Sequence, residues 1–379
     1  MKTKFKLSKI LISAVFVLFI FSLTVSLFAL PKQAKSENEK RVLAKFPELT
    51  AESLKSGEFT ADLDTYIADH FPLRDLFVGI NAYAGVLMGQ NGKSGIYKCS
   101  DGYLITEPAE FSETRITKNI SAFSKFAQKS GLPSSMIVVP TAGRIMDSVL
   151  PKYHKQFRDD ELFEIVSEKA VGIDLIDLRA SFTAESEKSQ LYYRTDHHLT
   201  SQGALLMYGE FCKSRNLTPA GFELSKSVDG FYGTAYSKSG LWLTKPDSVE
   251  ILKAVSGNSY RVTIDDGNNP QSYDDLYFES HLEKMDKYPV FLDGNHSLVR
   301  IENKDCRNGK RLLLIKDSYA HCFSTFLIEN YEEICMIDLR YFRASVSELI
   351  ASEKLNEILF LYGAENINSS TDIARLNLG

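Results

Sequence analysis

The sequence predicts an α/β protein with a mostly parallel central sheet, preceded by one N-terminal transmembrane helix. Three observations support this fold class. Short apolar runs of strand length alternate with helical segments in the C-terminal half, a rhythm typical of parallel strands joined by crossover helices. An uncharged stretch at 10–30 lies near the N-terminus. Residues 220–300 are rich in Gly, Asn, Asp and Ser and interrupt the rhythm, which favours a loop- and β-rich insertion.

The N-terminal segment has the pattern of a membrane anchor. Four lysines precede a 21-residue stretch without charge, and about 20 apolar residues suffice for a helix to cross a bilayer. Leu27 and Ala29 make a poor cleavage site, so we expect an uncleaved anchor, with a cleaved signal peptide and a secreted protein as the alternative. Positive charge stays on the cytoplasmic side, so the C-terminal part is expected outside the cell membrane.

This topology predicts four segments along the chain. They are a basic cytoplasmic tail at 1–9, a transmembrane helix at 10–30, a linker at 31–45, and an extracytoplasmic domain at 46–379 with an insertion at about 220–300.

The elements of the domain follow from local patterns. Residues 46–89 are helical in pattern with an interruption at Phe71-Pro72, and 92–105 resemble a hairpin. Thr200 is a good N-cap for the helix that follows it. The remaining expected elements are strands at 135–140, 172–178, 259–264, 311–315, 334–338 and 358–362, and a helix at 159–170.

The composition excludes some classes of function. Of 379 residues, 44% are hydrophobic and 25% are charged, the net charge is −5, and no long basic stripe follows the N-terminus. We therefore expect no nucleic-acid partner. The five cysteines are widely spaced without a C-x-x-C pair. This spacing argues against a disulfide framework or a cysteine-rich zinc site but does not exclude a single disulfide bond.

The first candidate site residue is Ser318. Ligands of a parallel sheet bind beyond the carboxyl ends of the strands, and the run K-D-S-Y-A-H-C-F follows the strand ending at Ile315. A serine at this strand-to-helix junction exposes its hydroxyl, and the helix amides behind it can stabilise an anion. The alternative is that Ser318 only caps the following helix.

The second candidate is the run R-T-D-H-H-L-T at 194–200. Asp196, two residues before His198, can hold one ring nitrogen while the other deprotonates a serine hydroxyl. The two segments together predict a triad of Ser318, His198 and Asp196. The alternative is a metal site, as in metal-dependent phosphoesterases. Adjacent residues on an extended chain point to opposite sides, so we expect His197 to point elsewhere and no metal or other cofactor to be bound.

Further polar residues follow neighbouring strands. Gly363 and Asn366 come after the last strand, at the same edge of the sheet, and could donate to an oxyanion beside the Ser318 amide. Arg340 follows the strand ending at Asp338 and would face either the cleft or the solvent.

The string T-D-H-H-L-T at 195–200, with K-D-S-Y-A-H-C-F at 316–323, resembles the DHHW family of bacterial surface proteins. That family is similar to the SGNH-hydrolase-like proteins that O-acetylate alginate and other exported polysaccharides. Further matching stretches are D-H-F-P-L-R at 69–74, G-F-Y-G-T at 230–234, D-K-Y at 286–288 and L-D-G-N-H at 292–296.

The resemblance implies a circularly permuted SGNH-hydrolase-like fold and assigns the site. Asp196 and His198 would be the acid and base and Ser318 the nucleophile. Asn295 and, less directly, Arg144 become additional oxyanion candidates. The sequence departs from the family in two places: Leu199 stands where the family has tryptophan, and Lys316-Asp317 stands where the polysaccharide acetyltransferases often have glycine.

By this resemblance the protein would be a membrane-anchored acetyltransferase or esterase. It would act on a cell-surface or exported polysaccharide without a cofactor, and transfer would need a polytopic membrane acyltransferase as partner on the donor side. The alternatives are a non-catalytic surface protein that binds glycan or protein on the same fold and, third, a metal-dependent phosphoesterase.

Overall fold

The computed structural model describes residues 2–267 and 269–377, with the side chains of 2–8 and 377 left undescribed. The lysine side chains of the predicted cytoplasmic tail up to residue 8 therefore lie outside the described residues. The chain divides into two compact units, one formed by 1–93 with 237–242 and the other by 94–236 with 243–379. The predicted domain boundary at residue 46 stays a prediction.

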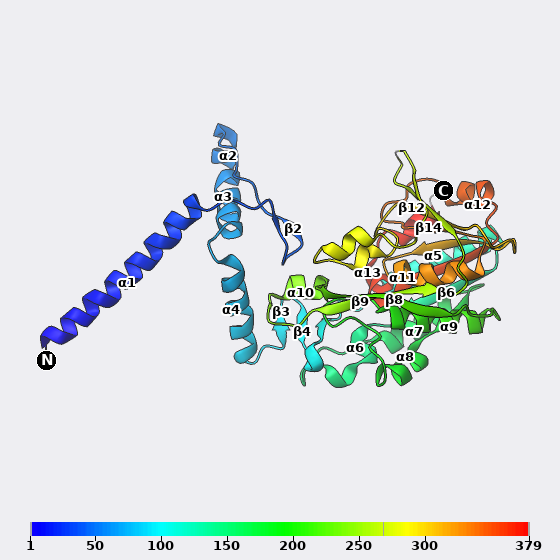
Figure 1. The fold of residues 1–379 in the computed structure, drawn as a ribbon, viewed down its shortest axis with the longest axis horizontal. Coiled ribbons are helices and arrows are strands. Elements are labelled where there is room, and N and C mark those ends of the chain that lie inside the picture. The colour runs from blue at the N-terminus through cyan, green and yellow to red at the C-terminus, as the bar shows by residue number, and fades with distance from the viewer. Residues whose placement is uncertain (1, 268, 378–379) are drawn as a thin grey trace. The chain divides into compact units, whose positions relative to one another are not determined.

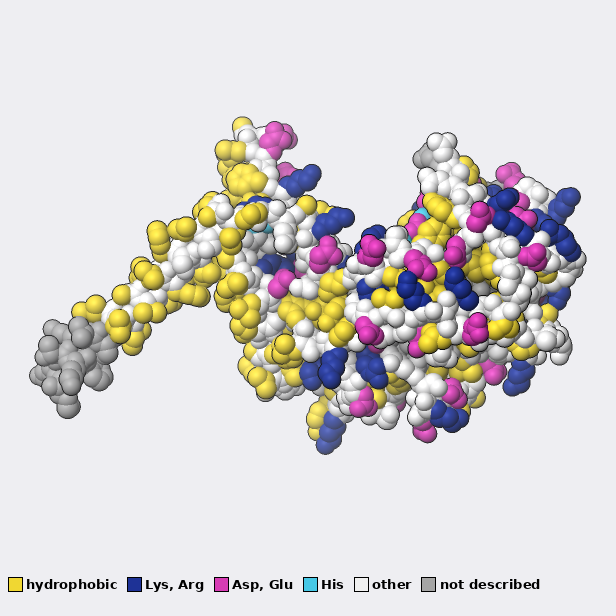
Figure 2. Space-filling model, viewed as in Figure 1, with side chains coloured by type: hydrophobic (Ala, Val, Ile, Leu, Met, Phe, Trp, Pro, Cys, Tyr) yellow, Lys and Arg dark blue, Asp and Glu magenta, His cyan; other side chains and the backbone are white. Residues whose placement is uncertain are grey.

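The first unit contains the apolar helix. Helix α1 spans Lys2–Ala29, and its segment Lys9–Ala29 has a mean hydropathy of 2.7 and is entirely unburied; Figure 2 shows hydrophobic side chains along it. By length and composition this helix suits a single membrane span or a signal sequence. The other elements of the unit are β1 (Lys35–Ser36), β2 (Arg41–Val42), α2 (Ala51–Ser56), α3 (Glu58–Asp69), α4 (Arg74–Leu87) and β3 (Gly92–Lys93).

The predicted interruption of the helical region at Phe71-Pro72 is confirmed. Helix α3 ends at Asp69 and α4 begins at Arg74, with Leu73 in the left-handed conformation at φ 60°. The inner face of α4 packs on the segment 237–242, where the single tryptophan, Trp242, donates from Nε1 to the Asp75 carbonyl at 2.9 Å.

The second unit is built on an eight-stranded sheet (Figure 1) in the order β11-β10-β12-β14-β13-β15-β6-β7. The five strands from β14 to β7 are parallel, while β12, β10 and β11 add an antiparallel edge. The bounds of the sheet strands are β6 (Ser134–Val139), β7 (Asp174–Asp177), β10 (Tyr260–Asp265), β11 (Gln271–Tyr273), β12 (Leu298–Asn303), β13 (Arg311–Lys316), β14 (Glu333–Ile337) and β15 (Glu357–Gly363). The predicted mostly parallel sheet is confirmed.

Helices cover both faces of this sheet, because its central strands are apolar on both sides. In β13, Leu312 and Leu314 enter one core and Leu313 and Ile315 the other. Helices α9 and α11 lie over the first core, and α5, α7, α12 and α13 over the second. The helix bounds are α5 (Glu113–Ser130), α6 (Ala142–Ile145), α7 (Asp159–Lys169), α8 (Arg179–Ser186), α9 (Ser201–Ser214), α10 (Thr234–Ser239), α11 (Ala320–Leu327), α12 (Val346–Ser352) and α13 (Ala364–Ser369).

The turn-rich region at 220–300 contributes strands and a loop that reaches the site. Strands β8 (Phe222–Phe231) and β9 (Asp247–Ala254) form an antiparallel pair, and β10 and β11 extend the central sheet. A 3₁₀ turn at Tyr288–Val290 follows. Outside this region, β4 (Ile96–Lys98) and β5 (Leu104–Thr106) form the predicted hairpin.

Candidate active site

Ser318 lies in the tight turn between β13 and α11. Strand β13 has β14 on one side and β15 on the other, so the chain connections diverge here and open a crevice at its carboxyl end. Ser318 is half-buried, and its Oγ lies 2.8 Å from His198 Nε2. Helix α11 has no side-chain cap at its N-terminus. The hydroxyl therefore faces the imidazole instead of capping the helix.

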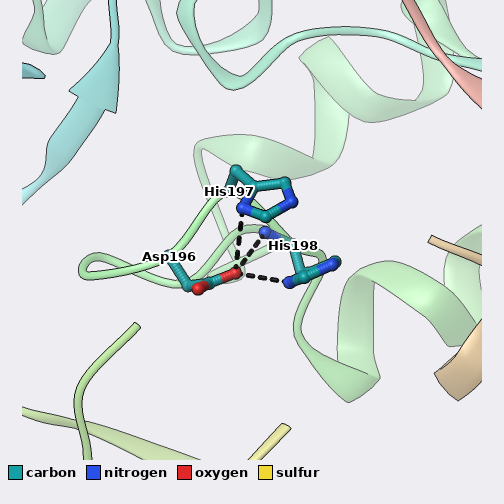
Figure 3. Close-up of side chains that lie close together, drawn as sticks. All are labelled: Asp196, His197 and His198. Atoms are coloured by element: carbon teal, nitrogen blue, oxygen red, sulfur yellow. Dashed lines mark hydrogen bonds and ion pairs between the residues drawn. The ribbon is translucent and has the colours of Figure 1, made fainter. Parts of the chain in front are cut away.

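His198 and Asp196 come from a bend between two paired residues. Tyr192 and Leu199 form an isolated antiparallel bridge, and the chain between them bends at 194–198. His198 Nδ1 lies 2.5 Å from Asp196 Oδ1, which also accepts from the His198 backbone N–H at 3.0 Å (Figure 3). With Asp196 on Nδ1, the imidazole presents Nε2 to Ser318 as a proton acceptor. The structure thus brings the three predicted triad residues together.

The other oxygen of Asp196 is held by the start of α10. Thr234 donates to Asp196 Oδ2 from its backbone N–H at 2.6 Å and its hydroxyl at 3.1 Å. Burial alone would raise the pKa of Asp196, but the two histidines and these hydrogen bonds outweigh it and hold the pKa well below its usual range. Asp196 is therefore a carboxylate that can stabilise an imidazolium at His198.

The expectation that His197 points away from the site is wrong. Its ring centroid lies 3.9 Å from that of His198, and its Nδ1 lies 3.4 Å from Asp196 Oδ1 (Figure 3). The rule that adjacent side chains alternate applies to extended chain, and here the chain bends. One ligand atom from each of Asp196, His197 and His198 lies within 4.8 Å of the others, a spacing compatible with a metal ion.

The hydrogen bonds of these groups favour acid–base chemistry over metal binding. His198 uses Nδ1 for Asp196 and Nε2 for Ser318, while His197 Nδ1 lies 2.9 Å from the Thr234 hydroxyl. Both oxygens of Asp196 accept hydrogen bonds. A metal ion would have to break the contacts that orient His198 toward Ser318.

Tyr288 is a site residue that the triad prediction did not include. Its ring stacks on the His198 imidazole, with centroids 3.8 Å apart and planes at 10°. Its hydroxyl donates to the Ser318 carbonyl at 3.2 Å, and burial raises its pKa well above the usual value, so the phenol stays neutral. The D-K-Y stretch at 286–288 carried a family resemblance, but nothing in it indicated stacking on a histidine.

The oxyanion candidates after β15 bind Asp317. The Gly363 N–H and Asn366 Nδ2 each donate to Asp317 Oδ2 at 2.7 Å, and the Tyr319 N–H donates to Oδ1 at 3.0 Å. Asp317 thereby ties the serine turn to the end of β15. Among the described residues, the Ser318 backbone N–H makes no hydrogen bond within the protein.

The remaining oxyanion candidates make other contacts: Arg340 and Asn295 bind each other, and Arg144 binds an aspartate. Arg340 binds the buried Asp338 through Nε at 2.9 Å and donates from Nη2 to Asn295 Oδ1 at 3.0 Å. With Asp317 and Asn366, Arg340 lines a small cavity of about 30 Å³ beside the serine turn. Arg144 instead pairs with Asp160 at 2.9 Å.

A buried polar pair lies directly before the serine turn. Lys316 is 1% exposed, and its Nζ donates to His321 Nε2 at 2.7 Å, with Asp338 Oδ2 at 3.5 Å. Burial lowers the pKa of Lys316 to about 8, and burial together with Lys316 holds the pKa of His321 well below its usual value. His321 is therefore a neutral acceptor for Lys316.

Comparison with known sequences finds two families that match parts of the chain. Residues 174–337 match the family described as DHHW protein. The resemblance to the DHHW family is confirmed. This DHHW region includes Asp196, His198 and Ser318. Residues 100–223 match a second family, described as SGNH hydrolase-like domain, acetyltransferase AlgX. No curated protein matches the chain.

Solved structures share the fold of the DHHW region and its surroundings. A DHHW family protein from Eubacterium siraeum DSM 15702 is 22% identical with a TM-score of 0.62, covering 74% of this chain and 95% of that one. Bacillus cereus PatB1 with a sulfonyl adduct is 17% identical with a TM-score of 0.62, covering 74% and 97%. The O-acetyltransferase domain of Pseudomonas putida AlgJ is 14% identical with a TM-score of 0.50, covering 74% and 98%. The predicted SGNH-like α/β fold is confirmed.

Proposed function

We propose that the protein is an extracytoplasmic O-acetyltransferase or esterase that acts on a polysaccharide through Ser318, His198 and Asp196. The contact that carries the proposal is the 2.8 Å separation of Ser318 Oγ and His198 Nε2, with Asp196 on the far side of the ring. The match to an acetyltransferase family and the AlgJ O-acetyltransferase domain support the choice of acetyl transfer.

The chemistry follows from this arrangement. Ser318 Oγ attacks the carbonyl carbon of an acetyl ester while His198 Nε2 takes the hydroxyl proton. The donor alcohol leaves with that proton, and the acetyl group stays on Ser318. A sugar hydroxyl, or water in an esterase, then gives its proton to His198 and attacks the acetyl carbon, which restores Ser318. The Ser318 N–H is the first donor to the oxyanion, and Asn295 is the candidate for the second, because Asn366 Nδ2 already donates to Asp317.

The setting proposed for this reaction is the outer face of a cell membrane. The apolar helix α1, with lysines at its N-terminal side, would hold the domain there as a single-pass anchor. A transferase would receive acetyl groups from a polytopic membrane partner, whereas an esterase would need none.

Hydrolysis of p-nitrophenyl acetate by the full-length protein in detergent tests the triad. We expect Ser318→Ala and His198→Ala each to lower kcat/KM by at least about 10³-fold, and His321→Ala to affect it far less. A sulfonyl fluoride should modify the wild type at Ser318 and not the Ser318→Ala variant. Equal rates in all variants would contradict a catalytic triad and support a non-catalytic binding protein.

A further inference from the structure

The second unit contains a cleft of about 370 Å³ that none of Asp196, His198 and Ser318 lines. Its wall consists of the loop before α5, the loop before α7 and the first residues of α13. The residues that matter for its chemistry are Glu110, Phe111, Lys155, Gln156, Arg158 and Glu365. A volume of this size suits a small ligand or a short segment of a polymer.

The cleft lies at the same edge of the sheet as Ser318. Helix α13 follows β15 directly, and Thr141, which also lines the cleft, comes after β6. The order β13-β15-β6 and a strand spacing of roughly 5 Å place the ends of β15 and β6, from which two parts of the cleft wall continue, about 5 Å and 10 Å along the sheet from the end of β13. That is the span of one or two sugar rings. Glu365 is near enough to Tyr319, next to Ser318, to contribute to its raised pKa after burial.

The cleft is held in shape by buried contacts behind its surface. Asn368 donates to the Glu110 carbonyl at 2.9 Å and accepts from the Ser112 N–H at 2.8 Å, which ties the α5 loop to α13. On the other side, Asp159 accepts from the Thr141 N–H at 2.7 Å. A ligand would therefore meet a largely preformed wall, which lowers the ordering cost of binding.

The charges of the cleft argue against an acidic ligand. Its two cations are already paired, Lys155 with Glu107 at 2.7 Å and Arg158 with Glu161 at 2.7 Å. The positive N-terminal ends of α5, α7 and α13 each carry an acidic residue in the first turn, which offsets the helix dipole. A uronate polymer would find no unpaired cation among the described lining residues.

The remaining groups suit a neutral sugar. The Arg158 guanidinium lies over the Phe111 ring, 3.9 Å from its centroid, and the ring holds this planar group in place, so that a pyranose ring can pack against its other face. Glu110 and Gln156 are exposed at the cleft and offer carboxylate and amide groups for hydroxyls. We propose that this cleft binds an uncharged sugar segment of the acceptor polysaccharide, next to the unit whose hydroxyl reaches Ser318.

This inference rests on the proposed function, and a binding experiment separates the two. The experiment measures binding of the full-length protein, in detergent micelles and at increasing concentration, to an immobilised panel of neutral, amino-sugar and uronate hexasaccharides. We expect neutral oligosaccharides to bind the wild type and the Ser318→Ala variant equally, because the nucleophile is not needed for binding. Ala109→Trp, which fills the exposed rim of the cleft, should weaken binding at least tenfold, and Gln156→Ala and Glu110→Gln by smaller factors.

Glu164→Gln, an exposed change on α7 outside the cleft, is the matched control and should leave binding as in the wild type. The proposal is overturned if no panel member binds, if uronates bind and neutral sugars do not, or if Ala109→Trp binds like the wild type. If Ser318→Ala kept its esterase activity and the binding pattern were as expected, the catalytic triad would be contradicted and the proposed sugar binding in the cleft would be supported.

Discussion

The ring of Tyr288 lies parallel to the imidazole of His198, with centroids 3.8 Å apart. The stack fixes the plane of the imidazole, whereas Asp196 fixes only one of its atoms. The chain brings Tyr288 from the turn-rich region before β12, while Leu199, which stands at the family tryptophan position, is 1% exposed and belongs to the core. In this protein the ring that stacks on the base therefore comes from a distant segment.

Tyr288→Ala should lower kcat for p-nitrophenyl acetate about 10- to 100-fold, since a freed imidazole spends less time aligned with Ser318. Tyr288→Phe keeps the stack and loses only the bond to the Ser318 carbonyl, so its kcat should stay within about threefold of the wild type. Tyr331→Ala removes another buried tyrosine, outside the site, and controls for lost core volume. Equal kcat values for Tyr288→Ala and Tyr331→Ala would show that the stack has no catalytic role.

Asp196 lies so close to residue 233 that only glycine fits at that position. A Cβ on Gly233 would lie 2.1 Å from the Asp196 Cβ and 2.6 Å from its Cα, so Gly233→Ala must displace the carboxylate. We expect a loss of esterase activity of at least about 10²-fold, although no titratable group is changed. Gly209→Ala on α9 meets nothing within 4 Å and should keep full activity and gain up to about 1 kcal/mol of stability. Full activity in Gly233→Ala would contradict the tight packing.

The parts of the site that could be predicted from the sequence are those with a local signal. Ser318 follows an apolar run that forms β13, and Asp196 and His198 stand two residues apart before a helix whose N-cap, Thr200, accepts from the Gly203 N–H at 3.2 Å. Strand periodicity and capping act over a few residues, so the sequence alone reveals them. The two segments together predicted the triad although 120 residues separate His198 from Ser318, and the family resemblance then assigned the same three residues.

The parts that could not be predicted depend on packing between distant segments. The direction of His197 is set by the bridge between Tyr192 and Leu199, which turns an apparently extended run into a bend. The stacking of Tyr288 and the clamp of Asp317 on β15 likewise join segments that no local pattern connects. The strand predicted at 259–264 forms as β10, but its antiparallel pairing with β11 and β12 at the edge of the central sheet follows from no local pattern.

Asp196→Asn should separate the catalytic and the stabilising effects of the carboxylate. The amide cannot hold the imidazolium at His198, so kcat should fall about 10²- to 10⁴-fold. The pKa of Asp196 is held below its usual range in the fold, so its contribution to the free energy of unfolding is present above the unfolded pKa of about 4 and is lost as the pH falls below it. Urea titrations at pH 3.5 and 6 should show a smaller stability difference in the variant than in the wild type; an unchanged difference would contradict a depressed pKa.

Lys316→Met should change how stability depends on pH in the alkaline range. The pKa of Lys316 is about 8 in the fold against 10.5 in a free side chain, so between these values the unfolded chain holds a proton that the folded chain has lost. Stability from this group therefore rises with pH, by up to about 3 kcal/mol between pH 8 and pH 10.5. Other buried groups also titrate in this range, so the test is the difference between proteins. Urea unfolding followed by far-UV circular dichroism should show the stability of the wild type, and of the control Lys118→Met, whose lysine is exposed on α5, rising relative to that of Lys316→Met between pH 8 and pH 10.5. The same pH dependence in all three proteins would mean that Lys316 keeps its proton, and hence its full charge, beneath the serine turn.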